Sequence, residues 1–348
     1  MTPDQITTLL GAVPMPLVLI GRDERIGALN PAAAALFGEG AVGRHYITVL
    51  RQPALLDCVE RALATGAPAE DELLSAEAFA DTTYRARAVP MDGAGTTGIL
   101  LSLEDISDMQ AAGQMRRDFV ANVSHELRSP LTALIGFIET LRGPARDDPQ
   151  AGARFLAIMQ READRMNRLI GDLLSLSRVE ADERLRPKTR VDVAATVSAA
   201  VAMLDKLAAD AGVALSLSGA EAPLQVPGDA DQLLQVFTNL IENAIKYGQT
   251  KVAIDISVNA HDRVLRAPAL RIEVADDGPG IDALHIPRLT ERFYRVDDHR
   301  SREMGGTGLG LAIVKHIVNR HRGRLRIKSV PGQGSRFIVV LPQGAPDA

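Results

Sequence analysis

Residues 239–247 read Asn239-Leu-Ile-Glu-Asn-Ala-Ile-Lys-Tyr247, and this stretch decides how the C-terminal half of the chain is interpreted. Its apolar residues recur at helical spacing, so it predicts a helix with Asn239, Asn243 and Lys246 on one face. Two amide oxygens on one face suit a hydrated Mg²⁺, and an amine one turn further on suits a phosphate. By itself, however, the pattern fits a solvated helix surface equally well.

Two glycine-rich segments follow this helix. Asp276-Asp-Gly278-Pro-Gly280 comes directly after a predicted strand, where a carboxylate can accept a hydrogen bond from an adenine amino group and glycines allow close approach. The run 305–311, Gly-Gly-Thr-Gly-Leu-Gly-Leu, precedes a predicted helix whose free N–H groups would favour an anion. It has neither the G-x-G-x-x-G spacing nor a Walker lysine. As a bare turn, the first segment would be common, whereas the second is by itself a moderate signal for phosphate binding.

The surrounding pattern predicts an α/β sandwich over residues 190–348. Helical periodicity alternates there with short apolar strands. The predicted helices cover 193–211, 231–247 and 309–320, and the predicted strands cover 251–258, 270–275, 323–329 and 336–341.

Two long amphipathic helices precede the sandwich. Apolar residues recur at spacings of three and four from Phe119 to Leu141 and again from Phe155 to Leu176, with a Gly- and Pro-containing break at 143–149. Residues 108–182 therefore predict an antiparallel helical hairpin. One hairpin would leave an apolar stripe exposed, whereas two copies bury it in a four-helix bundle, so we expect a homodimer. The charged, Pro-containing segment 180–188 is interpreted as a linker.

His125 falls outside the apolar seam of the first long helix, which predicts that its ring faces solvent. An exposed imidazole is mostly neutral at pH 7 and keeps one ring nitrogen free as a nucleophile. Glu126 can accept the other N–H, which would fix the tautomer. A lone exposed histidine on a helix is more often an ordinary surface residue, so this interpretation depends on its context.

Residues 1–107 predict a small α/β module. Strand patterns at 16–20 and 26–29 lead into Asn30-Pro31, a cap and first residue typical of a short helix. A second helix is predicted near 53–65, followed by strands near 83–89 and 98–103.

Composition excludes several other classes of protein. The formal net charge is −5, aromatics are 3% and there is no Trp, which argues against nucleic-acid binding. Cys58 is the only cysteine, so the chain cannot form an internal disulfide or a cysteine metal cluster. No apolar run reaches the roughly 18 residues of a membrane span. We expect a cytoplasmic chain, or the inner-face portion of a membrane-anchored protein whose anchor lies upstream.

In this order and spacing, the segments resemble the sequence boxes of sensor histidine kinases over about residues 110–342. His125 stands in the H box, and the others are 239–247, 276–281, Glu291-Arg-Phe-Tyr-Arg-Val-Asp297, 305–311 and 332–337. The segment 119–128 and the Phe-Tyr-Arg sequence are most similar to the phosphate-regulon sensor branch. The N-terminal module resembles a PAS sensor domain, on Asn30-Pro31 after a strand pair.

The resemblance implies a multidomain α+β protein. Residues 1–107 would be a PAS-like sensor with an unknown ligand, 108–182 a dimerising phosphotransfer hairpin, and 190–348 an ATP-binding sandwich of the type shared with Hsp90 and DNA gyrase. The implied activity is that of a protein histidine kinase: the γ-phosphoryl group of ATP would pass to His125 and then to an aspartate of a response regulator.

The resemblance also assigns residues to roles. Glu126 would be the general base, Asp276 would read adenine, and Asn239 and Asn243 would bind Mg²⁺. A mobile lid would run from Arg292 to Gly310. The other implied nucleotide contacts are Lys246, Tyr247, Gly278, Gly280, Arg295, Gly306, Thr307, Gly308, Leu309 and Gly310.

Ser129 stands where many relatives carry a Thr or Asn that positions water for phosphatase activity, so phosphatase activity toward the regulator is a hypothesis here. Two alternatives to the kinase stay open. A chaperone- or repair-type ATPase of the same fold would leave His125 and Glu126 without a role. A catalytically silent ligand-sensing scaffold would leave the asparagines and glycines without one.

Overall fold

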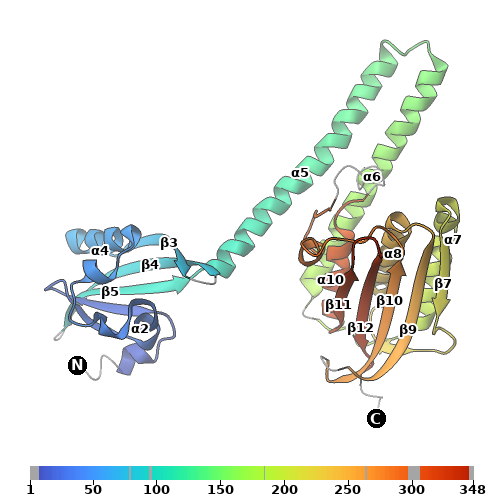
Figure 1. The fold of residues 1–348 in the computed structure, drawn as a ribbon. Helices are drawn as coiled ribbons and strands as arrows, with labels where there is room; N and C mark the ends of the chain where they lie inside the picture. The colour runs from blue at the N-terminus through green and yellow to red at the C-terminus, as the bar shows by residue number, and fades with distance from the viewer. Residues whose placement is uncertain are drawn as a thin grey trace. The chain divides into compact units, whose positions relative to one another are not determined.

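The computed structural model describes residues 8–77, 80–93, 96–183, 185–262, 265–296 and 306–344. The chain divides into two compact units, Met1–Asp118 and Phe119–Ala348. Each unit has its own sheet, and the long helix α5, Ser107–Arg142, extends across the boundary between them (Figure 1).

The N-terminal unit is an antiparallel sheet, with strand order β2-β1-β5-β4-β3 in its described part. Helix α4 packs on this sheet and buries Leu55, Cys58 and Val59 against it. The strand β3, with the acidic sequence Ala-Glu-Asp-Glu at its start, was not predicted from the sequence. The bounds are β1 Leu17–Gly21, β2 Ile26–Leu29, α2 Pro31–Phe37, η1 Glu39–Ala41, α3 Tyr46–Val49, α4 Pro53–Thr65, β3 Ala69–Glu77, β4 Ala80–Gly93 and β5 Thr96–Asp105.

Asn30 organises the entry into this unit. Its Oδ1 accepts hydrogen bonds from the amides of Ala33, at 2.9 Å, and Leu17, at 3.0 Å. Its Nδ2 donates to the carbonyls of Val13 and Met15, at 2.9 and 2.7 Å. The predicted cap of α2 is therefore confirmed, and the same side chain also fixes the segment before β1.

The helical hairpin predicted from the sequence is present. Helix α5 runs from Ser107 to Arg142 and α6 from Pro149 to Asp182. Asp148 caps α6 by accepting hydrogen bonds from the amides of Gln150 and Ala151, both at 3.0 Å.

The C-terminal unit contains the predicted α/β sandwich. Its main sheet has the order β11-β12-β10-β9-β7 among the described residues, and only the β7–β9 pair in it is parallel. Helices α7, α8 and α10 pack on one face of the sheet (Figure 1). The bounds are β6 Arg190–Asp192, α7 Val193–Ala211, β7 Ala214–Ser218, β8 Gln225–Pro227, α8 Ala230–Tyr247, β9 Lys251–Asp262, β10 Ala267–Asp276, η2 Ile286–Arg288, α10 Gly310–Arg320, β11 Arg324–Ser329 and β12 Ser335–Pro342.

The second half of α6 packs against this sandwich. Leu169, Leu176 and Val179 are buried in the same apolar core as the sandwich helices. Beyond them, Glu180 binds Arg292 at 2.6 Å, and Glu183 binds His316 at 3.0 Å. The predicted linker therefore begins as helix and is held to the sandwich by an ion pair and a hydrogen bond.

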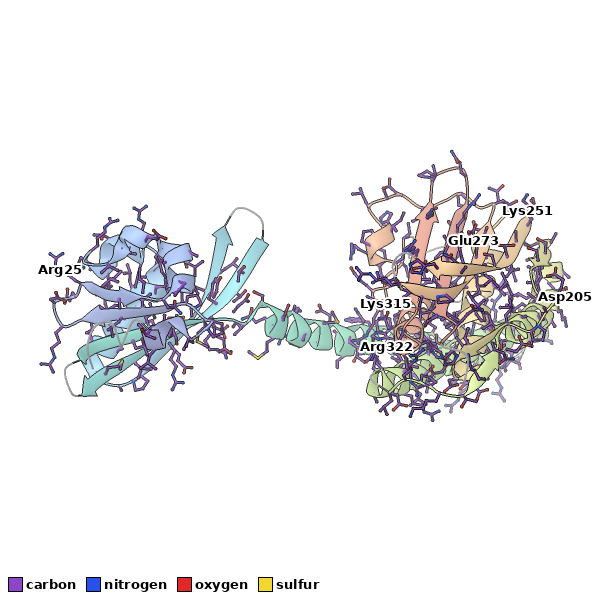
Figure 2. All side chains as sticks on the ribbon, turned by 90° about the horizontal axis from the view of Figure 1, so that it is seen from below. Arg25, Asp205, Lys251, Glu273, Lys315 and Arg322 are labelled. Carbon is purple, nitrogen blue, oxygen red and sulfur yellow. The ribbon has the colours of Figure 1, made fainter. Side chains whose placement is uncertain are left out.

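Charged side chains lie on the outside of the C-terminal unit, among them Asp205, Lys251 and Lys315 (Figure 2). None of the helices in the described part of the chain combines the length and the apolar composition needed to cross a bilayer.

Candidate active site

A cavity of about 300 Å³ lies in the C-terminal unit, where α8, the end of β10 and the start of α10 meet. Most of the predicted nucleotide residues line it together, although they come from separate segments of the sequence. They are Asn239, Asn243, Lys246, Tyr247, Asp276, Gly280, Arg295, Gly306, Thr307, Gly308 and Gly310.

Helix α8 supplies one wall of the cavity. Asn239, Glu242, Asn243 and Lys246 all line it, because their spacing places them on one face of the helix. Asn239 donates through Nδ2 to the carbonyl of Gly310 at 3.4 Å, so its Oδ1 is the atom available to a cation. Lys246 binds Glu242 at 2.7 Å. An amine, two amides and a carboxylate on one face fit a polyphosphate with its cation.

Asp276 stands at the end of β10. Its Oδ1 accepts hydrogen bonds from the amides of Gly278, at 2.9 Å, and Ser335, at 3.2 Å. Burial raises the pKa of this carboxyl. The next turn is closely packed, because Gly280 has a φ of +71° and a Cβ there would overlap the carbonyl of Val330. This close approach explains why a glycine is needed beside the cavity.

The glycine-rich segment leads into α10. Gly308 has a φ of +72°, and a Cβ there would stand 2.9 Å from the backbone of Phe293. Phe293 in turn donates its amide hydrogen to the carbonyl of Gly308 at 2.8 Å. The two ends of the predicted lid from Arg292 to Gly310 are therefore held together, while residues 297–305 lie outside the described residues.

Two predicted nucleotide residues do not line the cavity. Gly278 turns the chain beside Asp276, as its hydrogen bond shows. The side chain of Leu309 is fully buried in the core and anchors the start of α10. Any nucleotide contact of Leu309 would therefore come from its backbone.

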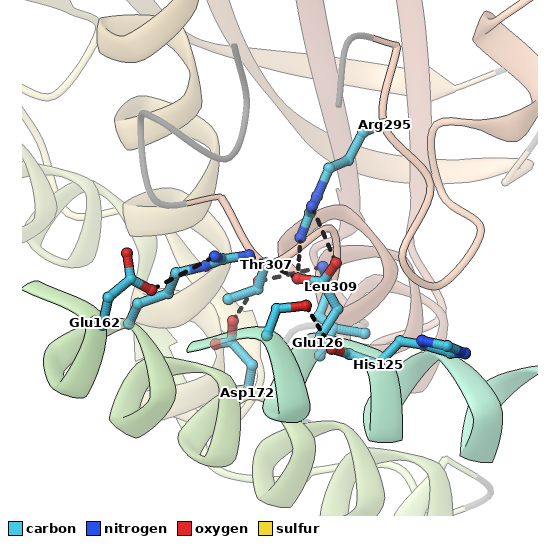
Figure 3. Close-up of polar contacts among 9 residues, drawn as sticks. His125, Glu126, Glu162, Asp172, Arg295, Thr307 and Leu309 are labelled. Atoms are coloured by element: carbon cyan, nitrogen blue, oxygen red, sulfur yellow. Dashed lines mark hydrogen bonds and ion pairs between the residues drawn. The ribbon is translucent and has the colours of Figure 1, made fainter. Parts of the chain in front are cut away.

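His125 is exposed on α5, which confirms the orientation predicted from the apolar seam. Its ring points away from the pair that Glu126 forms with Arg295 (Figure 3). One turn further on, the Ser129 hydroxyl donates to the carbonyl of His125 at 3.2 Å. The imidazole thus meets solvent on the surface of the hairpin.

Glu126 lies in an ion-pair cluster. Only 14% of its side chain is exposed, and its Oε2 binds Arg165 at 2.7 Å and Arg295 at 3.1 Å (Figure 3). Charge-assisted bonds to two guanidinium groups hold this carboxylate in place. The role of Glu126 as the partner of the His125 ring stays a prediction, because in this arrangement two arginines hold its carboxylate.

Two residues of helix α6 line the cavity but were not predicted from the sequence. Arg168 and Asp172 both line it. They stand four apart, and the only signal in the sequence was two charges one turn apart beside an apolar stripe. Such a signal is common on exposed helix faces. Their place depends on the packing of α6 against the sandwich, which no local pattern encodes.

A cavity of this kind in an α/β sandwich, on a chain that also presents an exposed histidine from a helical hairpin, is the arrangement expected of the histidine kinase class. Residues 115–182 match the family described as the His Kinase A (phospho-acceptor) domain. Residues 228–345 match the histidine kinase-, DNA gyrase B-, and HSP90-like ATPase family. The chain belongs to the sensor histidine kinases.

Two similar proteins agree with this assignment. The phosphate regulon sensor protein PhoR of Pseudomonas aeruginosa is 43% identical over 238 residues, which are 68% of this chain and 52% of that protein. The sensor protein kinase WalK of Staphylococcus saprophyticus is 37% identical over 246 residues, 71% of this chain and 40% of that protein. The chain therefore spans about half the length of these relatives or less.

One solved structure matches nearly the whole chain. The histidine kinase ThkA, in complex with the response regulator protein TrrA, aligns with a TM-score of 0.52 over 97% of this chain and 98% of that chain. At 20% sequence identity, this likeness shows a shared fold.

Proposed function

We propose that this protein transfers the γ-phosphoryl group of ATP to His125 and then to an aspartate of a response regulator. The observation that carries the proposal is the cavity in which Asn239, Asn243, Lys246 and Asp276 converge, on the compact unit that also exposes His125.

Different residues of the cavity contact different parts of the nucleotide. Asp276 accepts a hydrogen bond from the adenine amino group, and Gly280 lets the base approach the backbone. Lys246 contacts the phosphates, while the amide oxygens of Asn239 and Asn243 hold Mg²⁺, which neutralises phosphate charge. The donor set fits this cation, because amide and carboxylate oxygens line the same wall.

His125 is the acceptor in the transfer. A neutral ring nitrogen attacks the γ-phosphorus, a P–N bond forms, and the bond from phosphorus to the bridging oxygen of ADP breaks. The ring proton leaves to a base, for which we propose Glu126. This role requires Glu126 to exchange Arg165 or Arg295 for the ring, so transfer needs a rearrangement of the ion-pair cluster.

The remaining parts of the chain complete a signalling protein. The hairpin exposes a row of apolar side chains and is proposed to form a homodimeric four-helix bundle. The N-terminal unit, with its antiparallel sheet and the cap at Asn30, is proposed to be a PAS-like sensor whose ligand is unknown. The proposed domains are 1–107, 108–182 and 190–348.

Ser129 is proposed to position water for removal of the phosphoryl group from the regulator. Its hydroxyl lies one helical turn from His125 on an exposed face. The decay of phosphorylated regulator is measured with wild type and with Ser129→Ala. Slower decay is expected with the variant, and equal rates would remove this activity from the proposal.

The kinase itself is tested by incubating the full chain with radiolabelled ATP and Mg²⁺. Acid-labile, base-stable label is expected on the protein, and it should be absent in His125→Gln. His261→Gln, which changes another exposed histidine, is the matched control and should keep its label. Release of phosphate without labelled protein would favour a chaperone-type ATPase, and neither label nor release would favour a binding scaffold.

A further inference from the structure

Asp172 of α6 lies in the nucleotide cavity and has a specific partner there. Its Oδ2 accepts a hydrogen bond from the Thr307 hydroxyl at 2.6 Å (Figure 3). Thr307 belongs to the segment Gly306–Gly310, whose glycines line the same cavity. A carboxylate from the hairpin therefore reaches the part of the sandwich where phosphates are expected.

A second side chain of the cavity, Arg295, is also bound by a carboxylate of the hairpin. Its partner is Glu126, and the Arg295 side chain is only 4% exposed. Within the described residues, the buried Nε of Arg295 has no hydrogen-bond partner, so the guanidinium group is only partly satisfied by Glu126. Thr307 and Arg295 are thus each bound by a carboxylate of the hairpin. A phosphate of a bound nucleotide would offer the same two side chains a similar anionic oxygen.

Electrostatics makes the two kinds of anion compete. Burial raises the pKa of Asp172, and nearby Glu242 adds to this effect. The hydrogen bond from Thr307 and the charges of Arg168 and Lys246 oppose it. A carboxylate in a partly desolvated cavity repels an entering polyphosphate more strongly than a surface carboxylate would. The Thr307 hydroxyl has one hydrogen to donate, so it cannot donate to Asp172 and to a phosphate oxygen at once.

We propose that Asp172 is a residue of the nucleotide site that competes with the phosphates of ATP for Thr307, so that triphosphate binding and the packing of α6 against the sandwich oppose each other. This inference rests on the proposed function. It gives α6 a direct part in setting the affinity for nucleotide.

The test is a titration of the full chain with a non-hydrolysable ATP analogue and, separately, with adenosine. Asp172→Asn removes the charge and keeps the shape, so it should bind the analogue about 3- to 10-fold more tightly, with adenosine affinity unchanged. The KM for ATP in His125 labelling should fall by the same factor. Asp172→Glu, which keeps the charge, should not bind the analogue more tightly than wild type.

Asp164→Asn is the matched control. Asp164 lies two turns earlier on the same helix, is exposed and does not line the cavity, so its loss of charge should leave both affinities unchanged. If Asp172→Asn does not fold, as judged by thermal unfolding, Asp172→Ser provides the same loss of charge.

Three results would overturn the inference. The charge-removing variants could bind the analogue with unchanged affinity, or their affinity for adenosine could increase by the same factor. They could also bind the analogue more weakly in the presence of Mg²⁺, which would make Asp172 a metal ligand instead. Failure of the wild type to bind the analogue or to label His125 would contradict the proposed function itself, so the two failures are distinguishable.

Discussion

His321 lies in the core of the C-terminal unit with 1% of its surface exposed. Its Nδ1 donates to the carbonyl of Ile317 at 2.8 Å, and its Nε2 accepts from the amide of Asp229 at 3.0 Å. These partners require the neutral ring with its proton on Nδ1. Burial lowers the pKa of His321, so a proton binds the unfolded chain more readily than the folded one.

The first prediction follows from this difference in pKa. Because the unfolded value is about 6.5, the free energy of unfolding should decrease as the pH falls below it, by up to about 1.4 kcal/mol per pH unit. His321→Gln should be less stable at pH 8 and show a flatter decrease between pH 7 and 5. The measurement is urea unfolding across this range, with the exposed His261→Gln as control. Parallel curves for wild type and His321→Gln would contradict the prediction.

At the scale of single elements, Asn30 joins α2 to the strand β1 and to the segment before it. Asn30→Ala would leave two buried amides and two partly buried carbonyls without this partner and remove the cap of α2. The expected loss is about 2–4 kcal/mol in the stability of the N-terminal unit. Hydrogen exchange of the β1 and β5 amides should become faster. The exposed Thr48→Ala in the same unit should change little, and an equal effect of both variants would speak against the role of Asn30.

The elements also show which parts of the structure were predictable. Helices α7 and α8 were found within a residue or two, because each has an apolar period and an aspartate cap. Strands β3 and β7 were missed. β3 opens with acidic residues, and β7 is an edge strand of only five residues, Ala-Leu-Ser-Leu-Ser, whose place is set by parallel pairing with β9. Pairing with a distant strand leaves little trace in a local pattern.

The residues of the candidate site also divide into those that a local pattern places and those that only tertiary packing places. Asn239, Asn243 and Lys246 were predictable, because a short helical spacing places them on one face. The ion pairs of Glu126 with Arg165 and Arg295 join residues that are 39 and 169 positions apart. Such contacts depend on how α5 and α6 pack on the sandwich, so local periodicity could not reveal them.

At the scale of the whole molecule, the helical hairpin exposes large apolar side chains to solvent. Leu131 and Ile135 on α5 are 49% and 50% exposed, and Leu156 and Leu174 on α6 are 58% and 56% exposed. Side chains of this size at helical spacing on two neighbouring helices form the kind of surface that a second copy would bury in a four-helix bundle.

The prediction is that Ile135→Asp shifts the chain from dimer to monomer, because a charge buried in the bundle without a partner costs several kcal/mol. Sedimentation equilibrium should report half the wild-type mass at micromolar concentration. Val258→Asp places the same change on β9 in the sandwich, at a side chain 57% exposed, and should keep the wild-type mass. Affinity for the ATP analogue should be kept by both variants, since neither residue lines the cavity. A dimer that withstands Ile135→Asp would place the contact elsewhere than on this stripe, and the proposed four-helix bundle would have to be given up.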